Sequence, residues 1–135
     1  MKRLCLGFIL ACAAAGASAD WTLVGGSSGV YSAYADRESA QKTPENHVRM
    51  WTLYDFSMTD YSATGHRHQS TAALRDYDCD GARVRLVSFV DYAENMGGGK
   101  IISSNGDPST WQPRRWEPVV SGAVDEALLK VACGR

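Results

Sequence analysis

Hydrophobic and polar residues alternate along much of the chain with the two-residue period of β-strands. The pattern predicts six strands, over residues 21–24, 30–35, 47–58, 70–79, 82–93 and 100–103. Turns rich in glycine, asparagine and aspartate separate most of them. The longest run, 47–58, carries apolar residues on both faces, which predicts a central strand. Asp80 and Gly81 predict a tight hairpin, because both tolerate positive φ. Residues 59–69 are polar and predict a loop, and an irregular segment is expected over 109–120.

The end of the chain changes to the period of an α-helix. Ser121 is the expected N-cap, Asp125 and Glu126 lie in early turns where the helix dipole favours acids, and Gly134 ends the helix. Apolar residues at spacings of three and four form one side of this helix: Val124, Ala127, Leu128, Val131 and Ala132.

Such a helix needs a surface to cover, and the only one available is a face of the sheet. Successive strands joined by short turns, without helical crossovers, indicate an antiparallel meander. The predicted fold class is therefore α+β, with one C-terminal helix packed on a face of an antiparallel sheet.

The first twenty residues have the pattern of an export signal. Lys2 and Arg3 precede a twelve-residue apolar run over 4–15, and Ala17-Ser18-Ala19 fits a small-x-small cleavage site. We predict a signal peptide over 1–19 and a single exported domain over 20–135. Residues 9–12 (Ile-Leu-Ala-Cys) are similar to a lipoprotein box, in which a lipidated Cys12 would hold the protein at the cell surface. Cleavage after Ala19 is favoured, because that site lies downstream and Cys12 would leave a very short signal.

Export changes the charge and cysteine counts. The 135-residue chain has a net charge of -1, whereas removal of 1–19 leaves 116 residues with 12 Lys and Arg against 15 Asp and Glu, a net charge of -3. This balance argues against nucleic-acid binding, and no apolar run is long enough for an ordinary transmembrane helix. Two of the four cysteines remain, and in an oxidising compartment Cys79 and Cys133 most simply pair with each other. The bond would enclose 55 residues, counted from Cys79 to Cys133, and contribute about 4 kcal/mol.

Two groups of metal-binding or acid–base residues are candidates for chemistry. His66 and His68 would share a face on a strand, but they fall in the predicted loop without a nearby Cys or His, which favours a solvated loop over a metal site. Asp76, Asp78 and Asp80 alternate along a strand end but lack the calcium-loop glycine and glutamate, so we interpret them as a solubilising polar face.

Two further motifs also fail to indicate catalysis. Residues 97–100 (Gly-Gly-Gly-Lys) lack the spacing of a phosphate-binding loop and lead into a strand, so a hairpin turn is the better interpretation. No serine lies in a Gly-x-Ser-x-Gly elbow. The sequence therefore predicts a protein that is not an enzyme and has no metal or cofactor.

The segment Trp111-Gln112-Pro113-Arg114-Arg115-Trp116 has the composition of a binding hot spot. Arginine can stack on tryptophan and can pair with carboxylates and sulfates. The alternative is favoured, however: the tryptophans fill the gap between sheet and helix while the arginines face water, because connections leading to a packed helix often need such side chains. The candidate ligand contacts are Arg83, Arg85, Trp111, Arg114, Arg115 and Trp116.

Short segments spread over nearly all of residues 20–135 carry a family resemblance. They are 21–24, 34–36, 48–51, 77–79, 83–86, 96–97, 116–119 and 127–133. The most specific are the strand end Tyr77-Asp78-Cys79, the turn Met96-Gly97 and the helix 127–133 ending in Cys133. In these segments the chain resembles the surface-adhesin protein E family of small exported Gram-negative proteins.

This resemblance implies an antiparallel sheet of about six strands, with the terminal helix fixed to one face by a Cys79–Cys133 disulfide. It also implies an adhesin-like function, because the named member binds host matrix and forms dimers. The expected function is an exported, non-enzymatic binding domain that contacts a protein or glycan partner, such as a host-matrix or envelope protein, and forms a homodimer. The alternative is a periplasmic structural or envelope-maintenance protein without adhesin activity. Family members held in the outer membrane look lipidated, whereas cleavage after Ala19 favours the periplasm or secretion.

Overall fold

The computed structural model describes residues 19–61, 65–106 and 108–134. The predicted signal peptide, apart from Ala19, lies outside the described residues, and Cys12 lies outside them too. No helix in the described ranges is long and apolar enough to cross a membrane.

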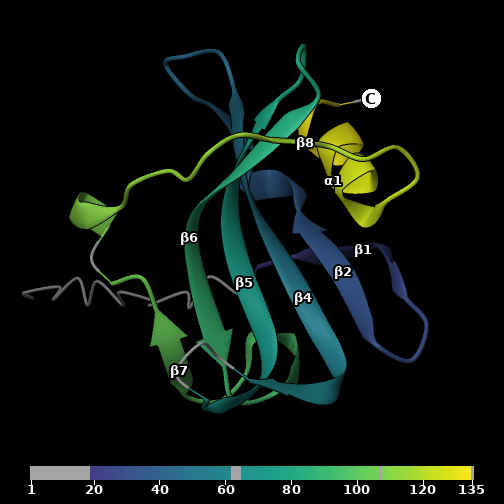
Figure 1. The fold of residues 1–135 in the computed structure, drawn as a ribbon, viewed down its shortest axis with the longest axis vertical. Coiled ribbons are helices and arrows are strands. Elements are labelled where there is room, and N and C mark those ends of the chain that lie inside the picture. The colour runs from purple at the N-terminus through teal and green to yellow at the C-terminus, as the bar shows by residue number, and fades with distance from the viewer. Residues whose placement is uncertain (1–18, 62–64, 107, 135) are drawn as a thin grey trace, which may run out of the picture.

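The described residues form one antiparallel sheet with a helix packed on it, so the predicted α+β meander is confirmed (Figure 1). The strands lie in the spatial order β1-β2-β4-β5-β6-β7. Two short strands join this path, β3 beside β4 and β8 beside β6. The strands are β1 Trp21–Ser27, β2 Tyr31–Asp36, β3 Gln41–Lys42, β4 Val48–Tyr61, β5 Arg67–Asp78, β6 Arg83–Tyr92, β7 Ile101–Ser104 and β8 Glu117–Pro118. The helices are η1 Arg37–Ser39, η2 Asn95–Gly97, η3 Pro108–Thr110 and α1 Val124–Ala132.

The predicted loop over 59–69 is largely wrong, because β4 and β5 continue into it. Their pairing resumes with Asp60 opposite His68 and Tyr61 opposite Arg67, after a register irregularity that begins at Asp55. The polar residues 59–61 and 67–69 therefore belong to the ends of two long strands.

The predicted hairpin between β5 and β6 is present, but its geometry differs from the expected one. The residue with positive φ is Ala82, at 48°. Gly81 allows a close approach instead: an added Cβ there would displace the carboxylate of Asp78. That carboxylate accepts a hydrogen bond from the Gly81 N–H at 3.0 Å, which closes the turn.

Helix α1 packs against β1, β2 and β4 and covers one face of the sheet (Figure 1). Leu128 and Ala132 are buried, and Val124 and Val131 pack beside them, as the helical spacing predicts. The sheet side of this core consists of Ala35, Met50, Tyr77 and Val84. The Ser121 cap is wrong: the helix begins at Val124 with Ala123 as N-cap and no side-chain cap. The Glu126 carboxylate instead accepts a hydrogen bond from the Gly122 N–H at 3.1 Å.

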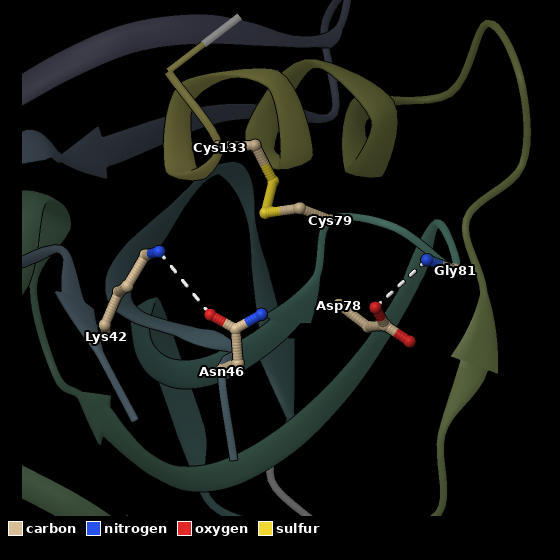
Figure 2. The surroundings of a disulfide bond; sticks show 6 residues. All are labelled: Lys42, Asn46, Asp78, Cys79, Gly81 and Cys133. Carbon is tan, nitrogen blue, oxygen red and sulfur yellow. Dashed lines mark hydrogen bonds between the residues drawn. A yellow bond between two sulfur atoms is a disulfide. The ribbon is translucent and has the colours of Figure 1, made fainter. Parts of the chain in front are cut away.

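A disulfide joins Cys79, just after β5, to Cys133, which caps the C-terminus of α1 (Figure 2). The two Cα atoms are 5.8 Å apart, and the predicted pairing is confirmed. The bond fixes the last turn of α1 at the end of the sheet where β5 turns into β6.

A second link between α1 and the sheet is polar. The Arg75 guanidinium donates to Asp125 on α1 at 3.0 Å and lies 5.0 Å from the centroid of the Tyr54 ring. The Tyr54 hydroxyl also donates to Asp125, at 3.4 Å. Burial raises the pKa of Tyr54 to about 12, with a smaller contribution from Asp125, while Arg75 acts in the opposite direction.

Removal of the disulfide is expected to lower the free energy of unfolding by about 4 kcal/mol in Cys79→Ser/Cys133→Ser, because the unfolded chain loses its crosslink. Urea unfolding followed by circular dichroism measures this loss. Each single Cys→Ser variant serves as the control, since it removes the same bond. Unchanged unfolding midpoints in all three variants would contradict the prediction.

Tyr54 is expected to make the fold sensitive to alkaline pH. Its pKa is higher in the folded chain, about 12, than its ordinary value of 10.0, so its contribution is complete below about pH 10 and is lost as the pH rises toward 12. Tyr54→Phe should therefore lose less stability than the parent protein between pH 9 and pH 11.5. Urea unfolding at both pH values tests this, with pH 7 as the reference. An identical pH dependence in the two proteins would refute the assignment.

Candidate ligand-binding surface

Three charged side chains lie in register across the face of the sheet that α1 leaves open. Arg49 on β4 pairs with Asp76 on β5, and Asp76 pairs with Arg85 on β6. Their chain neighbours Met50, Tyr77 and Val84 belong to the core under α1, so strand alternation places the charged residues on the opposite face.

Asp76 is the centre of this arrangement. Its carboxylate accepts two hydrogen bonds from Arg49, at 2.7 and 3.1 Å, and one from Arg85 at 3.0 Å. Asp76 is 0% exposed, so our interpretation of it as part of a solubilising face is wrong. The reason is that two guanidinium groups cover the carboxylate and replace the water that would otherwise solvate it.

A second ion pair lies beside the first. Arg83 donates to Asp78 at 2.7 and 3.0 Å, and the Arg83 side chain stays 46% exposed. The pKa of Asp78 is lowered, first by the hydrogen bond from the Gly81 N–H and then by Arg83. Asp80, the third member of the predicted set, is exposed.

Trp116 packs on the two arginines of β6. The Arg85 guanidinium lies 4.3 Å and that of Arg83 5.1 Å from the Trp116 ring centroid, and His47 contacts the ring edge-on at 4.6 Å. Trp116 therefore stacks on arginine, and the favoured interpretation, in which it fills the gap under α1, is wrong for this residue. We call Arg49, Asp76, Asp78, Arg83, Arg85 and Trp116 the arginine–tryptophan surface.

Trp116 reaches this position because the segment that contains it runs alongside β6. We call residues 111–120 the strap; it runs alongside β6, and Figure 1 shows it leading through β8 to α1. The Arg114 N–H donates to the Leu86 carbonyl at 2.8 Å, and the Val119 N–H donates to the Ala82 carbonyl at 2.9 Å. Between them, β8 pairs with β6.

The remaining predicted contacts do not stack on Trp116. Arg114 and Arg115 line a cavity of about 230 Å³ next to Arg85, which we call the arginine cavity. Trp111 is separate from both places: its indole N–H donates to the Gly106 carbonyl at 3.1 Å. The structure thus brings Arg83, Arg85 and Trp116 together. Arg114 and Arg115 lie next to Arg85, whereas Trp111 contacts the turn at Gly106.

The two candidate histidines are in different environments. His66 is exposed, whereas His68 lies in β5, is 4% exposed, contacts the Phe56 ring and lies 3.5 Å from an Asp91 oxygen. The predicted solvated loop is therefore wrong for His68, because β5 starts earlier than expected and buries it. Within the described ranges, no three His, Cys, Asp or Glu side chains form a group that could hold a metal ion.

Sequence reasoning missed Arg49 and the organising role of Asp76. Both could have been found from the sequence once the strands were aligned, because the alignment places residues of opposite charge opposite each other on β4, β5 and β6. Neither Arg75 nor Asp125 was expected to link β5 to α1, since that contact depends on where the helix is placed.

These features define a small, disulfide-stapled α+β domain whose most distinctive chemistry is a set of arginines on one sheet face and along a strap. Residues 21–134 match the family model of surface-adhesin protein E, and the chain belongs to this family. Membership in a family of surface adhesins indicates an adhesin-like, exported or cell-surface protein.

Solved structures show the same fold. Haemophilus influenzae protein E in its crystal form II has a TM-score of 0.59 and 15% identity, covering 82% of this chain and 91% of that one. A second structure of Haemophilus influenzae protein E has a TM-score of 0.56 and 15% identity, with coverages of 82% and 88%. No curated protein matches the sequence.

Asp76→Asn should lower the free energy of unfolding by about 3 kcal/mol, because Arg49 and Arg85 both lose the negative charge with which they form ion pairs. Asp78→Asn is the matched control and should cost about 1 kcal/mol or less, since its partner Arg83 is well exposed and an amide oxygen can still accept from Gly81. Urea unfolding at pH 7 measures both. Equal losses in the two variants would show that Asp76 does not organise this face.

Proposed function

We propose that this protein is an exported, non-enzymatic, adhesin-like binding domain that contacts a protein or glycan partner through the arginine–tryptophan surface and the adjoining strap. The observation that carries this proposal is the stacking of Arg83 and Arg85 on Trp116 on the face that α1 leaves open. Arginine and tryptophan dominate the energetics of protein interfaces, because each offers large contact area at defined geometry.

The charge of this surface favours a partner with acidic groups. Arg49, Arg83 and Arg85 outnumber Asp76 and Asp78 by one, and the exposed Arg114 and Arg115 add two more positive charges. The net charge of the whole chain is only -1, so this local excess is not a property of the composition. Complementary charge guides such a partner to the surface and fixes its orientation.

The surface is also held in position before a partner arrives. Arg49 and Arg85 are fixed by Asp76, and Arg83 by Asp78. Side chains already held in one geometry lose less entropy on binding, which increases affinity. Cleavage after Ala19 and release from the membrane remain part of the proposal, as does a periplasmic or secreted location.

A second candidate function is self-association in the envelope without adhesin activity. Its support is β1, which ends the described sheet and carries Leu23 at 61% exposure. An edge strand with free backbone groups and an exposed apolar side chain can pair with the same strand of a second copy. Such a homodimer is compatible with adhesin function, and sedimentation velocity would measure it directly.

Partner binding should weaken about tenfold in Arg83→Gln/Asp78→Asn, since this double variant removes an exposed guanidinium while keeping the net charge. The matched control is Glu126→Gln/Lys130→Gln, which removes an exposed ion pair of α1. Immobilised protein is first used to capture components from matrix and envelope extracts, and biolayer interferometry then compares the variants on the captured component. Capture of no component, or equal binding by both variants, would count against the proposal.

A further inference from the structure

The arginine cavity lies where three parts of the chain meet: the β5–β6 pair, the strap and the first turn of α1. Arg75 and Val84 line it from the sheet, Arg115 and Glu117 from the strap, and Asp125 from α1. The strap pairs with the edge of β6 and then leads into α1 (Figure 1).

Two of the four arginines that line this cavity already form ion pairs with a carboxylate, and two do not. Arg75 is held by Asp125 at 3.0 Å, and Arg85 by Asp76 at 3.0 Å. Arg114 and Arg115 are exposed and form no ion pair within the described part of the chain. Glu117 is the counter-charge on the strap, so the cavity keeps a positive excess with two guanidinium groups available to a ligand.

The backbone that carries these two groups is anchored on both sides. The hydrogen bond from the Arg114 N–H to Leu86 fixes one side, and β8 with the Val119 N–H fixes the other. A ligand therefore has to order only the ends of two side chains and not the strap itself, which lowers the entropic cost of binding.

Size and lining indicate what the cavity accepts. Its volume of about 230 Å³ is below the roughly 300–1,000 Å³ usual for complete small-molecule ligands, so it suits one group of a larger partner. Val84 and Leu86 supply apolar wall beside the arginines, which suits a methylene stem that ends in a carboxylate. The planar fork of arginine matches a carboxylate in bidentate geometry, and Arg49 already binds Asp76 in this way.

We propose that the arginine cavity binds the side-chain carboxylate of a glutamate or aspartate in an acidic segment of a protein partner, with Arg114 and Arg115 as the contacting groups. This inference rests on the proposed binding function and specifies the chemistry of the partner. A sulfate ester would use the arginines but would leave Val84 and Leu86 without an apolar contact.

The test is a titration of ¹⁵N-labelled protein, disulfide intact, with acetyl-Glu-Glu-amide, followed by amide and arginine Nε chemical shifts. Saturable shifts are expected at residues 84–86, 114–117 and 125, and they should decrease as salt is raised from 50 to 300 mM. Acetyl-Gln-Gln-amide is the neutral control and should cause no saturable shift. Absence of saturable shifts with the glutamate peptide, or shifts confined to other residues, would overturn the proposal.

Variants separate a direct contact from a general charge effect. Arg114→Gln/Arg115→Gln should bind the glutamate peptide at least tenfold more weakly. Arg37→Gln/Lys100→Gln removes the same charge from η1 and from the turn before β7, and its affinity should stay within twofold. Equal weakening in both double variants would overturn the assignment. If a heparin tetrasaccharide binds the same residues tenfold more tightly than the peptide, the proposed carboxylate ligand is wrong and the ligand is a sulfated glycan.

Failure of the cavity proposal can be told apart from failure of the proposed binding function. A captured partner that loses affinity in Arg83→Gln/Asp78→Asn but not in Arg114→Gln/Arg115→Gln would reject the cavity and keep the binding function. Peptide binding at the cavity, combined with capture of no matrix or envelope component, would keep the cavity and reject the adhesin-like function.

Discussion

The buried carboxylate of Asp76 is the contact on which the open face of the sheet depends. A carboxylate without water is costly unless it is paired and hydrogen-bonded, and here Arg49 and Arg85 supply three donors. Arg85 in turn stacks on Trp116, and Trp116 belongs to the strap that leads to α1. One buried charge on β5 therefore holds two arginines, and the pairing of the strap with β6 brings Trp116 to one of them.

The two faces of this sheet are covered in different ways. A domain of this size has one short α-helix among its described elements, which is enough to cover only one face, and the disulfide at Cys133 fixes that helix in place. On the opposite face, the end next to the β5–β6 hairpin carries Arg49, Arg83 and Arg85 in place of a helix, and Asp76 and Asp78 hold them. These ion pairs also keep guanidinium groups in position for a partner, so stability and the proposed binding use the same residues.

Much of the fold could be predicted from periodicity. The strands around 47–58 and 82–93 and the helical spacing from Val124 to Ala132 specify their elements locally, and the cysteine count specifies the staple. The predicted loop over 59–69 was wrong because polar residues at the end of a long strand look like loop residues until their partners are known. Ser121 was a reasonable cap by residue type, but β8 and the strap hydrogen bonds fix where the chain leaves the sheet, and the N-cap is two residues later, at Ala123.

The candidate surface was predictable in composition but not in arrangement. A stretch of two tryptophans and two arginines indicates stacking, yet nothing local separates Trp116, which stacks on Arg85, from Trp111, which bonds Gly106. The difference depends on the register of the strap against β6, a non-local property. The same register explains why the arginines have unequal roles. Those on β4 and β6 face a carboxylate across a strand pair and are held by it, whereas Arg114 and Arg115 lie on the outer side of β6, where no carboxylate of β5 faces them. Arg114 and Arg115 therefore keep their charge available to a partner, because the sheet supplies no carboxylate for them across a strand pair.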